Sequence, residues 1–269
     1  MSDRPPQPVA PLPCVIAATD RSQRSAQVAP RAARVAEALA LRLIVAHVEG
    51  GAEIAELIPG ADERLLQGQP SEALVALAEA EAAALLVLGL HRVRRVLDVL
   101  RLTTMERLVL AAPCPVLIAH QPAEAPFAQV LALSDFSPAS AASLVAAGRI
   151  APKAEFHVIH ALQMRLGARA EPGHREFETA MDRAMLARDR FLATPDLPAL
   201  AEPPEIVPGG VHEVLEFRCA ELGADLVCIG AHSGRVPGAL GNYARDLMRA
   251  PPTDLLVAKP GQMLAGGGP

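Results

Sequence analysis

The sequence of 269 residues contains no tryptophan, and aromatic residues make up only 3% of it. Because 51% of the residues are nonetheless hydrophobic, a folded core has to be packed mainly with alanine, valine, leucine and isoleucine. A basic excess is also missing, since the formal net charge is −5. Binding to nucleic acid requires a basic surface, so we expect no nucleic-acid partner.

Long apolar runs are missing as well. The longest, residues 82–90 and 108–119, are too short or too interrupted by proline to cross a bilayer. The proline-rich start has no basic region followed by an apolar one, so it does not read as a signal peptide. We therefore expect a cytoplasmic protein with no membrane partner.

Cysteine is scarce, with four residues in all, and none lies in a CxxC pair or in a Cys/His cluster with metal-ligand spacing. This favours buried, reduced thiols and predicts no metal site. A catalytic arrangement is likewise missing from the sequence, because no Ser-His-Asp order and no paired carboxylates on one helix face are recognisable. We assign no catalytic residue.

Strand-like and helix-like segments alternate along the chain, which is typical of a parallel α/β sheet. In the first part of the chain we expect strands at residues 14–18, 43–48, 64–66, 85–88 and 116–119, and helices at residues 22–40, 72–83 and 103–111. Ser71 is the expected N-cap of the second of these helices.

The pattern begins again after a linker-like segment at residues 121–126. The strand-end aspartates Asp20 and Asp135 are 115 residues apart, and the glycines Gly89 and Gly230 after the fourth strands are 141 residues apart. An internal repeat with anchors in the same order predicts two domains, at residues 14–120 and 127–260. A single continuous sheet, or halves that do not superimpose, would contradict this interpretation.

The second copy is 28 residues longer than the first between its second and fourth strands. The extra residues include an amphipathic helix at 174–193. The first copy thus has a shortened second helix region. We expect the face of its sheet left uncovered to pack on the other copy, on the proline-rich arm or on a second chain.

Taken together, these residues resemble a tandem universal stress protein. The resemblance is carried by ATD at 18–20 and LSD at 133–135, by GLH and GAH after the fourth strands, and by the segments TTMER and APCPVLIAH. It implies an α/β fold of two tandem Rossmann-like domains, each a five-stranded parallel sheet in the order 3-2-1-4-5. It also implies ATP binding, as in many members, and pairing through the fifth strands.

In ATP-binding members the loop after the fourth strand reads Gly, two residues, Gly, nine residues, Gly, then Ser or Thr. The second copy keeps three glycines on a loop that is two residues shorter than the first copy's, with Asn242 at the hydroxyl position. The backbone after the second strand would contact adenine. The nucleotide-binding candidates of the second copy are Asp135, Ala161, Gly230, Gly234, Gly241 and Asn242.

The first copy departs further from the pattern, because Arg92 replaces the second glycine and Leu102 the third. A side chain at residue 102 would obstruct the close approach of backbone to phosphate. Its weaker candidates are Asp20, Val48, Gly89, Arg92 and Thr103. In both copies the aspartate is equally suited to contact a ribose or to cap the following helix.

Three functions are compatible with these observations. The first is a stress protein that binds ATP or AMP mainly in its second copy, without strong catalysis. The second is a nucleotide-free scaffold with degenerate binding loops, and the third is an enzyme that adenylates or hydrolyses, which no identifiable catalytic group supports. Since exposed apolar sheet edges are pairing sites, we expect either a homodimer or an intramolecular pseudo-dimer through the fifth strands.

Overall fold

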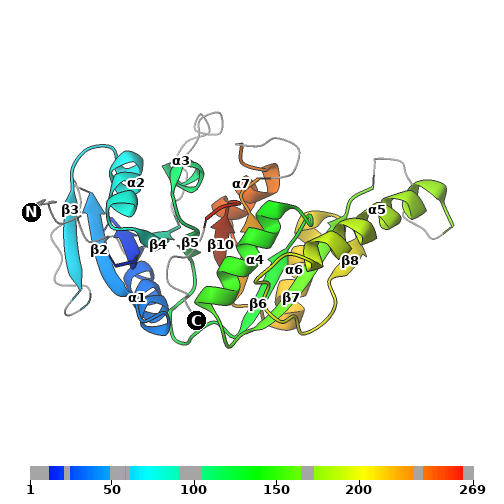
Figure 1. The fold of residues 1–269 in the computed structure, drawn as a ribbon, viewed down its shortest axis with the longest axis horizontal. Helices are drawn as coiled ribbons and strands as arrows, with labels where there is room; N and C mark the ends of the chain where they lie inside the picture. The colour runs from blue at the N-terminus through cyan, green and yellow to red at the C-terminus, as the bar shows by residue number, and fades with distance from the viewer. Residues whose placement is uncertain are drawn as a thin grey trace, which may run out of the picture.

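Strands and helices alternate through the whole of the computed structural model, which describes residues 12–20, 25–48, 58, 61–90, 104–164, 173–232 and 239–262 (Figure 1). The first half contains β1 (Cys14–Thr19), α1 (Val28–Ala38), β2 (Arg42–Val48), β3 (Asp62–Leu66), α2 (Pro70–Ala80), β4 (Ala83–Gly89), α3 (Thr104–Ala111) and β5 (Val116–Ala119). The second contains β6 (Gln129–Leu133), α4 (Pro138–Ile150), β7 (Glu155–Leu162), α5 (Arg175–Leu192), β8 (Glu205–Pro208), α6 (Val211–Leu222), β9 (Leu226–Gly230), α7 (Asn242–Arg249) and β10 (Asp254–Ala258).

All ten of these strands form one sheet, in the order β3-β2-β1-β4-β5-β10-β9-β6-β7-β8. The expectation of two separate sheets is therefore wrong. The strand order expected for each copy is nevertheless present twice within this sheet, because each half has the order 3-2-1-4-5 and all pairings within a half are parallel.

The two halves join where β5 and β10 pair in antiparallel orientation, with Leu117 opposite Leu256. These two residues occupy equivalent positions in the two copies, so the join resembles a dimer interface with an approximate two-fold axis. The predicted pairing through the fifth strands is thus present within the chain. Since β5 also pairs with β4, and β10 with β9, neither fifth strand has a free edge for a second chain.

Helices cover both faces of the sheet, and the strands alternate between them. Ile16 belongs to the core that α2, α3, α6 and α7 cover on one face, while Val15 belongs to the core that α1 and α4 cover on the other. Both residues are fully buried, and the two cores are mainly aliphatic, as the shortage of aromatic residues predicts. Burial on both faces is the usual environment of a parallel sheet.

Three helices cover the second face, α1 over the first half and α4 and α5 over the second (Figure 1). Helix α5 confirms the amphipathic helix predicted from the additional residues and buries Phe177, Ala184 and Phe191. On the same face of the first half, Leu65 on the edge strand β3 remains 65% exposed. None of the helices in the described part of the chain combines the length and the hydropathy that a membrane span requires.

Candidate functional site

The carboxyl edge of the second half's sheet brings three of the predicted residues to one level. The register pairs Leu133 of β6 with Ile159 of β7 and with Ile229 of β9. Asp135 and Ala161 therefore each follow this level by two residues, and Gly230 follows it by one. In the sheet β6 lies between β7 and β9, so these positions lie around the topological switch point of the second half. In open α/β sheets ligands bind at this point, outside the carboxyl ends of the strands.

The connection from β6 to α4 is a hydrogen-bonded turn. The Asp135 carboxylate accepts the Ser137 N–H at 3.0 Å, and the Ser134 hydroxyl accepts the Phe136 N–H at 2.9 Å. Ser137, and not Asp135, is the N-cap of α4, since its hydroxyl accepts the Ser140 N–H at 3.3 Å. Of the two roles left open for Asp135, capping the helix is thus taken by another residue, and the aspartate side chain stays exposed.

Phe136, in the same turn, has a left-handed backbone with φ of 58°. This conformation is strained for a bulky side chain, and such strain concentrates at functional sites. Its ring stacks on His160 at 5.0 Å and contacts Phe191 at 5.5 Å between centroids. His160 Nδ1 lies 2.8 Å from the Ser134 carbonyl, so this nitrogen carries the proton and holds the turn in place.

Gly230 ends β9 directly beneath α4. A β-carbon at this position would lie 2.7 Å from the carbonyl carbon of Ala139 and 2.7 Å from the Ser140 nitrogen. Real side chains do not approach backbone this closely, so the packing of α4 on β9 by itself requires glycine. The residue lies at the candidate site, yet its identity has a structural explanation that the sequence pattern does not reveal.

The loop between β9 and α7 is fastened at both of its ends. The Gly241 N–H donates to the Ala231 carbonyl at 3.0 Å, and His232 Nδ1 lies 2.8 Å from the Ala239 carbonyl. Gly241 is the N-cap of α7 with an ordinary φ of −63°, and Asn242 begins the helix with an exposed side chain. The predicted Gly234 lies outside the described residues.

A polar cluster beside α7 was not anticipated from the sequence. The Gln163 side-chain amide, just after β7, donates to the phenol oxygen of Tyr243 in the first turn of α7. The Tyr243 ring lies 5.5 Å from that of His212, whose Nε2 is 3.8 Å from the Asp246 carboxylate. Gln163 and Tyr243 are close in sequence to the predicted Ala161 and Asn242, so this hydrogen bond joins the two segments that carry these residues.

The first half repeats the same framework with fewer described residues. Asp20 follows β1 and is exposed, Val48 ends β2 and Gly89 ends β4. The Thr19 and Ser25 hydroxyls hydrogen-bond at 2.7 Å. Residues 115 positions later, Ser134 and Ser140, make the same contact at 2.9 Å, so this hydroxyl pair is repeated in the two copies. The predicted Arg92 and Thr103 lie outside the described residues.

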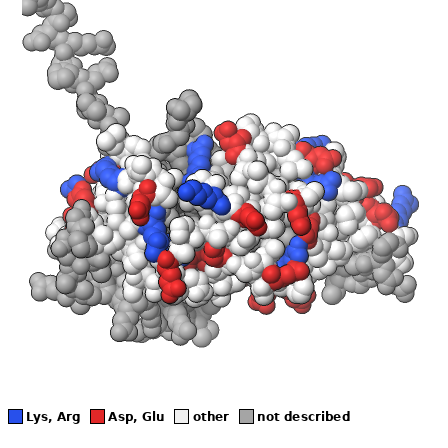
Figure 2. Space-filling view, turned by 90° about the horizontal axis from the view of Figure 1, so that it is seen from below, with Lys and Arg blue, Asp and Glu red and all other residues white. Residues whose placement is uncertain are grey.

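Among the described residues, neither a charged patch on the face of Figure 2 nor a metal-ligand cluster provides an alternative binding site. Acidic and basic side chains intermingle on the described part of the face drawn in Figure 2, in keeping with the net charge of −5. Within the described ranges no group of three or more His, Cys, Asp and Glu side chains is arranged to hold a metal ion. The arrangement at the carboxyl edge of the second half therefore remains the candidate for ligand binding.

Comparison with known proteins places this geometry in context. Residues 49–120 match the sequence model of the universal stress protein family. The fold is similar to a universal stress protein structure from Pseudomonas aeruginosa UCBPP-PA14, with a TM-score of 0.64 and 21% identity, covering 94% of this chain and 95% of that one. No match was found among curated proteins.

Two further structures agree over a similar length. A functionally unknown protein from Pseudomonas aeruginosa PAO1 has a TM-score of 0.63 and 20% identity, with 94% of this chain and 95% of that one covered. A universal stress protein from Archaeoglobus fulgidus DSM 4304 has a TM-score of 0.63 and 18% identity, with 92% and 98% covered. The resemblance inferred from the sequence is thus confirmed: residues 49–120 match the sequence model of the universal stress protein family, and the whole chain has the fold seen in universal stress protein structures, repeated in tandem.

Proposed function

We propose that this universal stress protein binds an adenine nucleotide, ATP or AMP, at the carboxyl edge of its second half, and that it acts in the cytoplasm in the response to stress. The observation that carries the proposal is the convergence of Asp135, Ala161 and Gly230 at one end of the sheet, beside the N-terminus of α7, whose Gly241 N–H donates to the carbonyl of Ala231, the residue after Gly230. In this arrangement Asp135 would contact the ribose and the backbone at Ala161 the adenine.

The N-terminus of α7 provides the phosphate side of the proposed site. Its N-cap is glycine, which leaves room for an anion beside the first backbone N–H groups, and these groups carry the positive end of the helix dipole. No acidic residue lies in the first turn of this helix to compete with a bound phosphate. Asn242 supplies an exposed side-chain amide at the same end.

Ligand analysis of the natively purified full chain tests this proposal. We expect mass spectrometry to detect released ATP or AMP, and titration calorimetry to show binding of added nucleotide. Asp135→Ala should weaken binding about tenfold or more, the loss of a hydrogen bond to a charged acceptor. Gly241→Leu should abolish it by placing a side chain against the phosphates.

The matched control is Asp20→Ala, which removes the equivalent exposed aspartate of the first half and should leave the affinity unchanged. If Asp20→Ala abolishes binding and Asp135→Ala does not, the first half holds the nucleotide. A protein that is purified empty and shows no measurable affinity for ATP or AMP overturns the proposal.

A second candidate, a nucleotide-free scaffold, is favoured by one specific observation. The hydrogen bond from Gln163 to Tyr243 already joins the end of β7 to the first turn of α7, the two segments that would contact the nucleotide. If this bond only obstructs a functional site, Gln163→Ala should strengthen nucleotide binding. If the chain is a scaffold, Gln163→Ala should leave it without affinity for nucleotide.

A further inference from the structure

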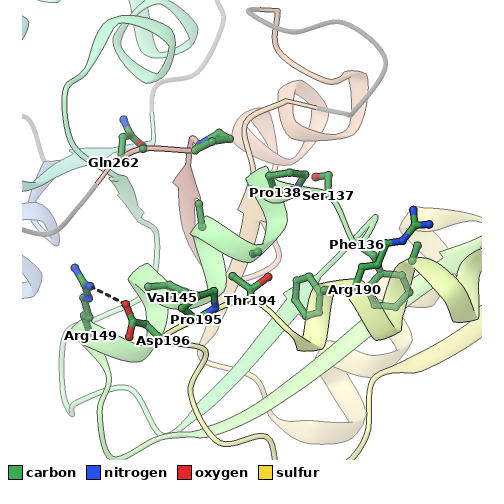
Figure 3. A pocket seen from close by; sticks show the side chains of 16 residues that line it. Phe136, Ser137, Pro138, Val145, Arg149, Arg190, Thr194, Pro195, Asp196 and Gln262 are labelled. Atoms are coloured by element: carbon green, nitrogen blue, oxygen red, sulfur yellow. Dashed lines mark ion pairs between the residues drawn. The ribbon is translucent and has the colours of Figure 1, made fainter.

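A groove on the second half runs along the outer side of α4 and ends at the β6–α4 turn, where Phe136 and Ser137 line it next to Asp135 of the candidate nucleotide site. It has a volume of about 560 Å³, within the range of small-molecule sites. Its floor is the outer surface of α4, and its walls come from the end of α5, the turn at residues 194–196 and the segment 260–262 (Figure 3). We call it the α4 groove.

The lining of the α4 groove is mostly apolar. Small residues on α4, Ala141 and Ala142, leave space above the helix, and Val145 continues this surface toward the end of α4. Phe136 and Phe191 form the wall at the other end, where their rings contact each other at 5.5 Å. The groove thus offers an elongated apolar surface, which suits a hydrocarbon chain.

Positive charge lies at both ends of this apolar surface. Arg149 and Arg190 line the groove with Val145 and Thr194 between them (Figure 3), and Asp196 is the one carboxylate among the described lining residues. Asp196 is 3.9 Å from the Arg149 guanidinium and 73% exposed, so it neutralises that arginine weakly. The groove therefore carries more positive than negative charge, which favours an anionic ligand.

The equivalent arginine of the first half shows how such a position binds oxygen. Arg34 precedes Arg149 by 115 residues and has the same half-buried place in α1. Its guanidinium donates to the carbonyls of Ala123 and Glu124, in the linker that crosses α1. In the second half the additional helix α5 and its following turn stand beside α4 instead, and they create the groove.

Two residues that line the groove have strained backbone. Phe136 and Asp196 have φ of 58° and 62°, in the left-handed region that non-glycine residues rarely adopt. Both place their side chains at the groove wall. Strain of this kind is retained where it positions a side chain for a purpose.

From these observations we propose that the α4 groove binds an organic anion with an extended apolar body, of the class of fatty acids. The hydrocarbon chain lies along Val145, Phe136 and Phe191, and the carboxylate is bound by Arg190, with Arg149 at the other end of the groove. This proposal does not depend on nucleotide binding.

Titration calorimetry of the full chain with dodecanoate, and with dodecanol as the neutral probe of equal chain length, tests the proposal. We expect dodecanoate to bind and dodecanol to bind about twofold to fivefold more weakly, as one solvent-exposed ion pair allows. Arg190→Met should reduce the affinity for dodecanoate to that for dodecanol. Arg183→Met, an exposed arginine of α5 outside the groove, should leave both affinities unchanged.

A second pair of variants tests the place of binding. Val145→Trp fills the groove and should abolish binding, while Leu186→Trp, at an exposed position of α5, should not. Equal affinity for the two probes, or unchanged binding in Val145→Trp, overturns the proposal.

Two other results would show a different occupant and would also overturn the proposal. If dodecanoate binds only after removal of residues 263–269, the chain's own C-terminal segment occupies the groove. If the protein is a dimer that Val145→Trp dissociates, a second copy of the chain occupies the groove.

Discussion

At the scale of single residues, the same glycine serves two explanations. The sequence predicts that Gly230 lets backbone approach a phosphate, whereas the structure shows that α4 passes too close for any β-carbon. Both explanations require only the absence of a side chain, so the sequence alone does not distinguish them. Asp135 is different, because its structural role does not require an aspartate. Its exposed carboxylate accepts one backbone N–H group of the turn, which other acceptor side chains could also do. Ligand binding therefore remains the proposal for this residue.

Replacing Gly230 with alanine tests the packing explanation directly. Gly230→Ala should lower the free energy of unfolding by about 1–3 kcal/mol, the usual cost of overpacking a core, because helix backbone cannot move aside as a flexible side chain does. Urea denaturation monitored by circular dichroism measures the change. The control is Gly210→Ala, whose added carbon would meet only the Glu213 side chain at 3.3 Å and should cost far less. Equal midpoints for Gly230→Ala and the unaltered chain would contradict the packing explanation.

The four cysteines are free and buried, as their sequence surroundings predict. Burial raises the pKa of the Cys14 and Cys219 thiols to about 11, and that of Cys114 and Cys228 to about 12. Because the folded state holds these protons more tightly than the unfolded state, the thiols contribute stability that is fully present below pH 9. This contribution is lost as the pH rises from 9 toward 12.

Thiol labelling at pH 8 checks this environment. In the native protein a disulfide reagent such as dithionitrobenzoate should modify fewer than one thiol per chain within minutes, since buried neutral thiols are poor nucleophiles. In concentrated urea all four should react. Rapid modification of the native chain would show that at least one thiol is accessible and ionised.

At the scale of helices and strands, the apolar runs in the sequence predict both ends of every first-half strand to within two residues. The helix starts are less well predicted. Helix α1 begins at Val28 and not at residue 22, because Ser25 is engaged with Thr19 in the preceding turn. Helix α2 begins at Pro70 with Gln69 as N-cap, so the prediction for Ser71 is wrong; proline is well suited to a first helical position.

Side-chain contacts between distant helices and strands could not be predicted from the sequence. The hydrogen bond from Gln163 to Tyr243 and the α4 groove each combine residues from distant segments, and no spacing rule relates them. The same is true of the ion pair between Arg31 of α1 and Asp254 of β10 at 2.7 Å, whose side chains are 5% and 0% exposed. Asp254 also accepts the backbone N–H groups of His120 and Gln121, so it fastens the linker to both halves.

Substitution of Asp254 tests how strongly this contact holds the halves together. Asp254→Asn keeps an acceptor for the two backbone N–H groups but leaves the Arg31 guanidinium buried without its counter-charge, which should cost about 3–5 kcal/mol. Chemical denaturation measures the loss. Asp62→Asn, which breaks the exposed pair of Asp62 and Arg64 at 2.8 Å, should change stability by less than about 1 kcal/mol. Similar losses in the two variants would mean that burial is not the deciding factor.

At the scale of the whole molecule, the strand order of each half is what the resemblance to universal stress proteins implies, and the repeat in the sequence extends that expectation to both copies. The merging of the halves into one sheet was not fixed in advance. An apolar fifth strand has the same local sequence whether it pairs within its own chain or with another one, and only the linker length and the buried contacts decide between them. The first-half face beside Leu65 is still predicted to require a cover.

The internal pairing has a measurable consequence in solution. With both fifth strands occupied, light scattering should give a mass near 28.2 kDa, that of one chain. The remaining sheet edges, β3 and β8, are short, and β3 carries charged side chains, which discourages edge-to-edge association. A stable dimer would show that another surface of the chain is an interface.

The contact between α3 and α7 shows what fusion of two copies permits. The buried carboxylate of Glu106 lies 3.4 Å from Arg245 and 3.1 Å from Arg249 across the approximate two-fold axis. Arg245 follows Glu106 by 139 residues, the same interval as between Leu117 and Leu256. In a symmetric pair of identical chains these two positions would hold the same residue and repel each other. Within one chain the two positions differ and carry opposite charges, so this contact favours pairing of one half with the other over pairing of two identical halves.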